Sequence, residues 1–220
     1  MADLREELLQ LLPDGPTTVQ MRALLELGET QLFGDVEGAA FAHAEAQLGV
    51  LHGRPTAKTL HEFKLACGQP PELLAFSPIE LEGYDSLPLS LSSRGGEGRG
   101  EEATRLTPEL WSKVSPSLSA TLANVMERRA VFCAQVDGQP VSFAWAPLRS
   151  EGWFDVWVQT LPEFRRRGLG QRVASALLRS ERSEGRSPVW CAADSESLGL
   201  GESLGFVDFT QSLWSARLSR

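Results

Sequence analysis

One stretch, residues 153–183, constrains the fold more than any other part of the chain. Within it the sequence changes from a strand pattern to a helix pattern. Residues 153–160 are aromatic and β-branched and a proline soon follows, as expected for a strand that ends in a loop. Apolar residues then recur at helical spacing and predict a helix over 169–183. Gly168 and Gly170 therefore stand where the strand gives way to the helix.

Such a junction is suited to binding an anion. The first NH groups of a helix have no backbone acceptor, and the helix dipole adds partial positive charge at the same end. Glycine permits close approach of the backbone to a ligand, and arginine adds positive charge and paired donors. The junction therefore predicts a cradle for a phosphate or pyrophosphate. Its residues are Arg165, Arg166, Arg167, Gly168, Leu169, Gly170 and Gln171.

Plainer interpretations of the same residues stay open. A Gly-x-Gly pair also occurs in ordinary tight turns, and three consecutive arginines commonly form a solvated surface. The dinucleotide fingerprint does not apply, because Val173 stands where its third glycine would be. No Gly-Lys-Ser/Thr follows, which also removes a nucleotide triphosphatase loop.

The Arg-x-x-Gly-x-Gly arrangement after a strand resembles the acetyl-coenzyme A signature of the GCN5-related N-acetyltransferase (GNAT) superfamily. A second block strengthens the resemblance. Residues 185–194 look like the fifth strand of the superfamily, and residues 195–206 look like its next helix and terminal Leu-Gly-Phe. The block is similar to the FR47-like and related bacterial branches. The resemblance covers about residues 104–220.

The resemblance implies an α/β fold of the α+β type. A mixed, mostly antiparallel twisted sheet would carry one splayed pair of parallel strands and flanking helices. The strand-helix-strand unit needs a right-handed crossover, which places the cradle at the carboxyl end of strand 153–160. The sequence itself predicts a hairpin over 130–136 and 141–146 around an Asp-Gly turn, then strand 153–160, helix 169–183, strand 188–193, a short helix near 195–204, and strands 206–210 and 212–218.

In the superfamily, the pantetheine arm of coenzyme A lies between the strands that correspond to 153–160 and 188–193. The resemblance implies that the loop after the first strand holds the pyrophosphate and that a main-chain NH near Val158 meets the thioester carbonyl. Such a donor would stabilise the developing oxyanion by about 3 kcal/mol. Asp194 and Ser197 belong to the expected site, although both residue types also cap helices. The full expected set for acetyl-CoA is Val158, Gln159, Thr160, Arg165, Arg166, Arg167, Gly168, Leu169, Gly170, Gln171, Asp194 and Ser197.

The sequence departs from the superfamily at the proton-transfer groups. Many relatives carry a tyrosine at the position of Gly201, and the only tyrosine of this chain, Tyr84, lies in the N-terminal half. Asp155, Glu151 and Glu127 are candidate general bases, because they lie on or near strands expected to wall the substrate cleft. Each is also consistent with an ordinary exposed carboxylate. A water relay through backbone groups would require none of them.

The chain is expected to have two parts. Residues 1–91 form a smaller N-terminal helical or mixed α/β region, residues 92–103 read as a glycine-rich, charged linker, and residues 104–220 form the GNAT domain. By resemblance to a related bacterial branch, the N-terminal region would help to shape the acceptor pocket. A decayed copy of the same fold is an alternative.

Periodicity within the N-terminal region is uneven. Residues 38–44 and 47–52 suit either a hairpin or a helix of small residues, and periodicity does not decide between them. The clearer expectations are helices over 4–12, 19–27 and 55–67 and a buried strand over 73–76.

Composition limits the class of protein. Hydrophobic residues make up 42% and charged residues 23%, as in an ordinary globular domain, and no membrane span or secretion signal is expected. We therefore expect a cytoplasmic protein. The net charge of −8 argues against nucleic acid as the main partner. The cysteines and histidines share no metal-ligand spacing, so no metal site is expected, and a homodimer is left open.

The sequence therefore predicts an enzyme, an N-acetyltransferase that moves the acetyl group of acetyl-CoA to a primary amine by direct attack in a ternary complex. The acceptor, a small-molecule or peptide amine, is not specified further. The alternative is a catalytically weak or inactive CoA-binding GNAT-like sensor or partner-binding module, which Gly201 favours. A third interpretation, an Arg/Gly turn in an unrelated α/β fold, predicts no binding of coenzyme A.

Overall fold

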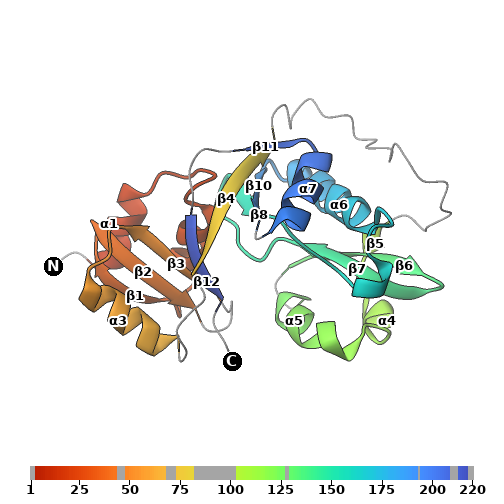
Figure 1. Cartoon of the computed structure of the whole chain (residues 1–220), viewed down its shortest axis with the longest axis horizontal. Helices are drawn as coiled ribbons and strands as arrows, with labels where there is room; N and C mark the ends of the chain where they lie inside the picture. The colour runs from red at the N-terminus through yellow and green to blue at the C-terminus, as the bar shows by residue number, and fades with distance from the viewer. Residues whose placement is uncertain are drawn as a thin grey trace.

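The structure is a computed structural model of the 220-residue chain. It describes residues 3–43, 48–67, 73–81, 103–126, 129–192, 194–208 and 213–217. Figure 1 shows these residues in two lobes, with strand β4 (Leu73–Leu81) running between them. Within these ranges, no helix combines the length and hydrophobicity that crossing a membrane requires.

The N-terminal lobe is built on a three-stranded antiparallel meander. Its elements are α1 (Leu4–Leu11), α2 (Val19–Glu26), β1 (Gln31–Asp35), β2 (Gly38–His43), β3 (Leu48–Gly53) and α3 (Ala57–Ala66). The ambiguous residues after position 37 thus form a hairpin rather than a helix. β2 is buried along its whole length, because Ala39 and Phe41 pack toward α1 and α2 while Ala40 and Ala42 pack toward α3. A strand that is covered on both faces shows no alternation of polarity, which explains why periodicity was uninformative.

A long sheet connects the two lobes. Its strand order in the described part of the chain is β1-β2-β3-β12-β4-β10-β8. In addition, β11 pairs with the C-terminal end of β4, Ile79 to Leu81. β12 (Leu213–Arg217), from the end of the sequence, lies antiparallel to both β3 and β4. Strands from both sides of the expected linker therefore interleave in one sheet. Residues 92–102 of that linker lie outside the described residues.

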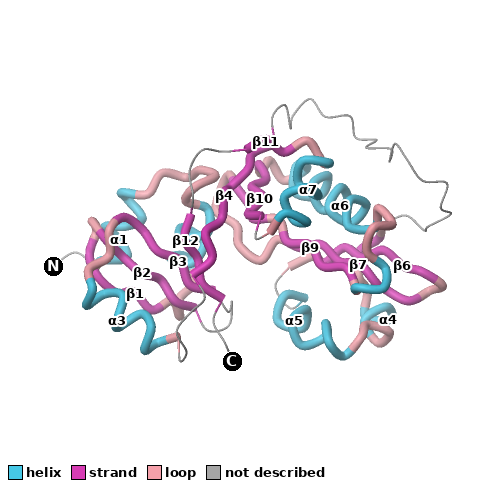
Figure 2. Tube along the Cα trace, viewed as in Figure 1, coloured by secondary structure: helices cyan, strands magenta, loops and turns pink. Residues whose placement is uncertain are grey.

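A second, antiparallel sheet forms the centre of the other lobe. Its strands are β5 (Thr104–Arg105), β6 (Val131–Val136), β7 (Gln139–Trp145) and β9 (Trp157–Thr160). Asp137 and Gly138 join β6 to β7 with φ angles of 53° and 73°, as the predicted Asp-Gly turn requires. Helix α6 (Leu169–Ser183) covers one face of this sheet, and α4 (Pro108–Trp111) and α5 (Pro116–Met126) lie on the other (Figure 2).

The predicted strand over 153–160 is divided between the two sheets. Its first part, β8 (Trp153–Asp155), pairs in parallel with β10 (Ser187–Ala192). Its second part, β9, pairs only with β7 among the strands that the structure describes. The change occurs at Val156, whose NH still donates to the Val189 carbonyl at 3.0 Å. On its other edge, β10 pairs antiparallel with β4 from Val189 to Ala192. The mixed α/β sheet with a splayed parallel pair confirms the predicted fold class.

The short helix α7 (Ser195–Ser203) and β11 (Phe206–Asp208) follow β10. A buried carboxylate holds β8, β10 and α6 together at the end remote from α7. Glu181, near the end of α6 and 1% exposed, forms ion pairs with Arg149 before β8 and with Arg186 before β10. Both strands that border the splay are therefore tied to α6 where they begin.

Candidate functional site

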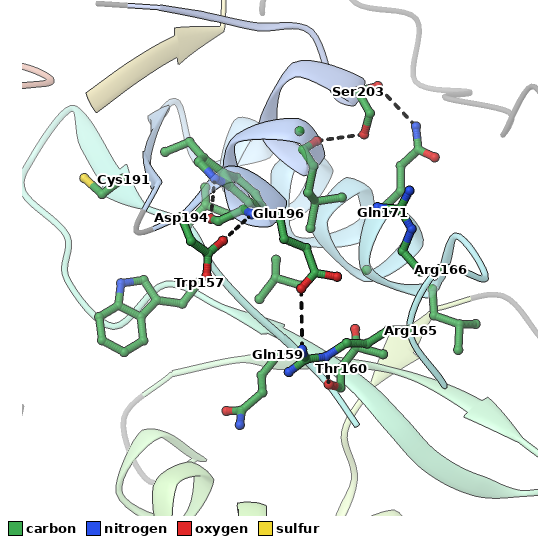
Figure 3. A pocket seen from close by; sticks show the side chains of 18 of the residues that line it. Trp157, Gln159, Thr160, Arg165, Arg166, Gln171, Cys191, Asp194, Glu196 and Ser203 are labelled. Carbon is green, nitrogen blue, oxygen red and sulfur yellow. Dashed lines mark hydrogen bonds and ion pairs between the residues drawn. The ribbon is translucent and has the colours of Figure 1, made fainter. Parts of the chain in front are cut away.

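A pocket of about 640 Å³ lies where β9 and β10 diverge. Its walls come from β9, the loop and first turn that lead into α6, the end of β10, α7, and two residues of the N-terminal lobe, Gln20 and Leu48. Figure 3 shows Trp157 and Cys191 at one end and Arg166 and Gln171 at the other. The first is called the acceptor end and the second the cradle end.

The cradle end presents unpaired main-chain donors. The first hydrogen bond of α6 runs from the Arg172 NH to the Gly168 carbonyl at 3.2 Å, so the three preceding helical NH groups have no partner within the helix. No hydrogen bond among the described residues uses an NH group from residues 166–171. Gly168 has a φ of 74° and Arg166 a φ of 60°, a conformation that costs an L-residue about 1–2 kcal/mol. This geometry directs several adjacent NH groups outward at a helix N-terminus.

Gly170 lines the narrow part of the pocket. A Cβ at this position would lie 3.3 Å from Leu200 Cδ2, 3.5 Å from Val158 Cγ1 and 3.6 Å from Thr160 Oγ1. A larger side chain would therefore fill the space between α6, α7 and β9. The absence of a side chain keeps this passage open.

Arg165 extends across the pocket. Its Nη1 lies 3.4 Å from Glu196 Oε2 on α7, and its Nε donates to the Thr160 carbonyl at 3.3 Å (Figure 3). Both charged side chains are about half exposed, at 49% and 53%. The positive charge beside the cradle is thus partly balanced by a carboxylate.

The three consecutive arginines do not have the same orientation. Arg165 and Arg166 line the pocket, whereas Arg167 is not among the lining residues. The Arg167 guanidinium lies 5.2 Å from the centre of the Phe164 ring and donates to the Glu163 carbonyl at 3.2 Å. The structure therefore places Arg167 beside the pocket lining, and its contact with acetyl-CoA stays a prediction.

Main-chain donors of β9 also face the pocket. The Leu161 NH donates to the Val141 carbonyl of β7, whereas the Val156 NH donates to β10. Because the NH groups of a strand alternate between its two edges, those of Val158 and Thr160 point to the same side as that of Val156. Beyond Val156 no described strand pairs with that edge, and Val158 and Thr160 both line the pocket, so these two donors are directed into it.

The remaining residues of the expected set also line the pocket. Asp194 caps α7 by accepting from the Ser197 NH at 2.7 Å, and Ser197 Oγ accepts from the Trp190 indole at 3.2 Å. Both therefore have structural partners. Gly201, at the position where many relatives have tyrosine, is buried in α7. The members of the expected set that line the pocket are Val158, Gln159, Thr160, Arg165, Arg166, Gly168, Leu169, Gly170, Gln171, Asp194 and Ser197.

Asp155 lies behind the acceptor end rather than on its wall. The side chain is 0% exposed, and its Oδ2 accepts from Gln20 Nε2 at 2.9 Å and from the Trp157 indole at 2.8 Å. Burial raises the pKa of this carboxyl from 3.8 to about 6, although these hydrogen bonds oppose the shift. Gln20, Trp157 and Cys191 line the pocket next to it, whereas Asp155 does not. Asp155 is thus on a strand beside the pocket, as the sequence predicts, but it does not line the pocket, and its role as a general base stays a prediction.

Cys191 adds a thiol to the acceptor end. Its Sγ lies 3.5 Å from Gln20 Nε2. Burial and the nearby Asp155 charge raise the pKa of the thiol well above its ordinary value. The protonated form of a thiol is a weak nucleophile.

Of the other proton-transfer candidates, the structure describes Glu151 alone. Glu151 is exposed in the bend before β8 and does not line the pocket. Glu127 and Tyr84 lie outside the described residues. Among the residues that the structure describes, no group of histidine, cysteine and carboxylate side chains could hold a metal ion.

The expected set lacked half of the residues that line the pocket, among them Gln20 and Leu48, which belong to the N-terminal lobe. Gln20 is 4% exposed on α2, and the other buried residues of this helix are apolar. A single glutamine within a predicted buried helix face is the signal that could have drawn attention to it.

Comparisons with known proteins agree with this geometry. Residues 121–211 match the family model described as GNAT acetyltransferase. No curated protein matches the sequence. The similar solved structures include a GCN5-related N-acetyltransferase-like protein from Streptococcus suis 89/1591, with 17% identity and a TM-score of 0.68 over 98% of this chain and 99% of that one. They also include a GCN5-related N-acetyltransferase from Kribbella flavida, with 13% identity and a TM-score of 0.58 over 100% and 97%.

These structural relatives share the fold along nearly the whole chain, including the N-terminal lobe. The family match has a narrower span, but it contains β9, the cradle, α6, β10 and α7. The splayed strands, the unpaired NH groups and the sequence match coincide in this region. Residues 121–211 are therefore similar to the GNAT acetyltransferase family, and the chain as a whole shares the fold of the solved GCN5-related N-acetyltransferases.

Proposed function

We propose that the protein is an N-acetyltransferase that transfers the acetyl group of acetyl-CoA to a primary amine by direct attack in a ternary complex. The observation that carries this proposal is the group of unpartnered main-chain donors at 166–171, which lies beside the opening between β9 and β10. An anionic diphosphate is the part of acetyl-CoA that such donors bind.

The pocket fits the parts of acetyl-CoA in order. The diphosphate would accept hydrogen bonds at the cradle, with Arg165 and Arg166 supplying positive charge. The pantetheine arm would pass Gly170 and lie along the free edge of β9, where the Thr160 NH is available. The thioester would then reach the acceptor end near the Val158 NH. Acetyl-CoA contributes the activated acetyl group, and the residues of the chain bind and orient it.

Transfer requires few groups from the protein. The amine nitrogen forms a bond with the thioester carbon, the carbon-sulfur bond breaks, and the proton lost from nitrogen is balanced by the thiol formed on sulfur. A preorganised donor such as the Val158 NH stabilises the oxyanion by about 3 kcal/mol. Gly201 offers no side chain to protonate the leaving sulfur. A thiolate is a good leaving group, so water in the pocket would suffice for this proton.

The proposal includes the setting of the reaction. A cytoplasmic location would supply acetyl-CoA and keep the thiols reduced, and Cys67, Cys133 and Cys191 are free. The partners would be acetyl-CoA and a small-molecule or peptide amine rather than nucleic acid or a membrane.

A second function is a coenzyme A-binding module with little or no turnover. Two observations favour it, namely Gly201 at the usual tyrosine position and the placement of Asp155 behind the pocket wall. This alternative keeps the cradle and lacks the chemical step.

Ligand binding and turnover separate the two functions. A ligand at 100 times its Kd adds about 2.7 kcal/mol to the free energy of unfolding, so acetyl-CoA should raise the melting temperature clearly. Acetylated N-acetylcysteamine, which carries the thioester without the diphosphate, should produce no comparable shift at the same concentration. Equal shifts would contradict the cradle assignment.

Turnover is measured by the mass of acetylated amine, because the protein's own thiols would disturb a thiol assay. The enzyme forms acetylated product from 2-phenylethylamine, spermidine or a tripeptide in proportion to enzyme concentration. Binding of acetyl-CoA without product from any primary amine would support the second function.

A further inference from the structure

Gln20 belongs to the N-terminal lobe, yet it reaches the acceptor end of the pocket. It lies on α2, which packs against β8, and it meets Asp155 across 135 positions of sequence. Its side chain is 4% exposed and lines the pocket. The contact therefore brings a polar group from one lobe into the site whose cradle is built by the other.

The orientation of the Gln20 amide is fixed by the chemistry of its partner. An ionised carboxylate only accepts hydrogen bonds, so the NH2 group of Gln20 must face Asp155. The 2.9 Å distance from Nε2 to Oδ2 agrees with this assignment. The Trp157 indole donates to the same oxygen and holds the carboxylate in place. Gln20 Oε1 must therefore point away from Asp155.

Gln20 Oε1 has no hydrogen-bond donor among the described residues. It is a buried oxygen, and Asp155 Oδ1 beside it is unpartnered as well. A buried acceptor without a donor costs about 1–3 kcal/mol of stability. Because Gln20 lines the pocket, a ligand with an N–H group at this end could satisfy its oxygen.

The ligand at this end is the acceptor rather than the diphosphate. Figure 3 shows Cys191 and Trp157, both neighbours of this cluster, well away from Arg166 and Gln171 at the cradle. Two buried carbonyl or carboxylate oxygens attract a hydrogen-bond donor and disfavour an anion. A primary amine supplies such donors and is the nucleophile of the proposed reaction.

We propose that Gln20 binds the acceptor amine through Oε1, and that Asp155 is a positioning residue that holds the Gln20 amide in this orientation. The inference rests on the proposed acetyl transfer and assigns the N-terminal lobe a direct contact with the acceptor. Asp155 acts through Gln20 and does not touch the substrate.

Gln20→Met tests the contact, because methionine keeps the length of the side chain and removes both the oxygen and the amide donor. Gln31→Met on β1 is the matched control, since Gln31 is exposed and does not line the pocket. We expect Gln20→Met to raise KM for 2-phenylethylamine, spermidine or a tripeptide, whichever the wild type acetylates fastest, at least tenfold. Kd for acetyl-CoA should change less than twofold. Gln20→Asn, which keeps the amide on a shorter side chain, should recover part of the loss.

Binding of the same three amines to the protein saturated with coenzyme A gives a second measurement that needs no turnover. Calorimetry should show tenfold weaker binding of the amine to Gln20→Met than to Gln31→Met. If the wild type binds amines with coenzyme A but forms no product, acetyl transfer fails and the Gln20 contact is retained. Equal KM and equal amine affinity in the two variants would overturn the contact alone. A parallel loss of acetyl-CoA binding in Gln20→Met would also overturn it, because the role would then be structural.

Discussion

The two ends of the pocket are built in different ways. The cradle end comes mainly from one continuous stretch, residues 164–171, and relies on main-chain NH groups at a helix N-terminus. The acceptor end combines side chains from α2, β3, β9 and β10. Main-chain recognition depends mainly on backbone shape and on glycine, so a short motif can encode it. Side-chain recognition depends on which distant segments the fold brings together.

The difference also separates what is shared from what is particular to this chain. The signature glycines lie at the cradle end, and the family match over 121–211 does not reach Gln20 or Leu48 at the pocket. The departures, Gly201 and the buried Asp155, concern the end where chemistry would occur. Enzymes that share the acetyl donor, acetyl-CoA, but differ in the acceptor would keep the cradle end and vary the acceptor end. Four predictions test the comparison, from the largest expected effect to the smallest.

Asp155→Asn tests whether the buried carboxyl behind the acceptor end makes the free energy of unfolding depend on pH. Because burial raises the pKa of Asp155 from 3.8 to about 6, the folded protein holds this proton more tightly than the unfolded chain. Stability therefore falls as pH rises through this window and is constant above it. Relative to Asp155→Asn, the wild type should lose about 3 kcal/mol of unfolding free energy between a pH well below 3.8 and pH 7. Urea unfolding at several pH values measures this difference, and parallel curves would contradict it.

Gly170→Val tests the passage between the two ends. The valine side chain would crowd Leu200 and Val158, so acetyl-CoA affinity should fall at least a hundredfold, about 2.7 kcal/mol. Gly28→Val is the control, because a Cβ at Gly28 meets nothing within 4 Å and the residue lies outside the pocket. Thermal shift with acetyl-CoA should persist in the control and vanish in Gly170→Val. An unchanged shift in both would disprove the assigned route of the pantetheine arm.

Gly168→Ala tests the backbone geometry of the cradle. Gly168 has a φ of 74°, and a Cβ there meets nothing within 4 Å, so the substitution adds strain without a clash. We expect a loss of about 1 kcal/mol in unfolding free energy. Gly138→Ala has a similar φ of 73° and equally open surroundings in the β6–β7 turn. Chemical denaturation should show similar losses for both variants, while calorimetry should show weaker acetyl-CoA binding for Gly168→Ala alone.

Glu196→Gln tests the charge balance of the cradle. Removing the carboxylate releases Arg165 and takes a negative charge away from the expected diphosphate. Because the ion pair is about half exposed, the gain should be small, a two- to fivefold increase in acetyl-CoA affinity, below about 1 kcal/mol. Glu202→Gln, on the same helix and outside the pocket lining, should leave affinity unchanged. A weaker affinity in Glu196→Gln would show that the pair supports binding.

Local signals in the sequence predict much of the fold. The Asp137-Gly138 turn and the apolar periodicity of α6 were sufficient for the hairpin and the helix beside the cradle. The division of 153–160 at Val156 could not be predicted, because it depends on which neighbouring strands are present. β1 was not predicted either, since this short edge strand is mostly exposed and has weak alternation.

The candidate site was predictable at the cradle and not at the acceptor end. The glycines and Arg165 line the pocket as expected from a contiguous motif, whereas the orientation of Arg167 depends on its packing over Phe164. Asp155 is covered by α2, which packs against β8. Gln20 of this helix contacts Asp155 although the two residues are 135 positions apart in the sequence. Residue spacing carries no information about such a contact.

The position of β12 has a consequence for how the molecule is made. This strand lies between β3 and β4, although it is synthesised well after both of them. The hydrogen bonds of β3 and β4 to β12 can form only after residues 213–217 have left the ribosome. The N-terminal lobe therefore cannot mature as an independent unit during translation, even though domains usually fold in the order of synthesis. Leu48, which is paired with Arg217, would reach its final position only when β12 is inserted.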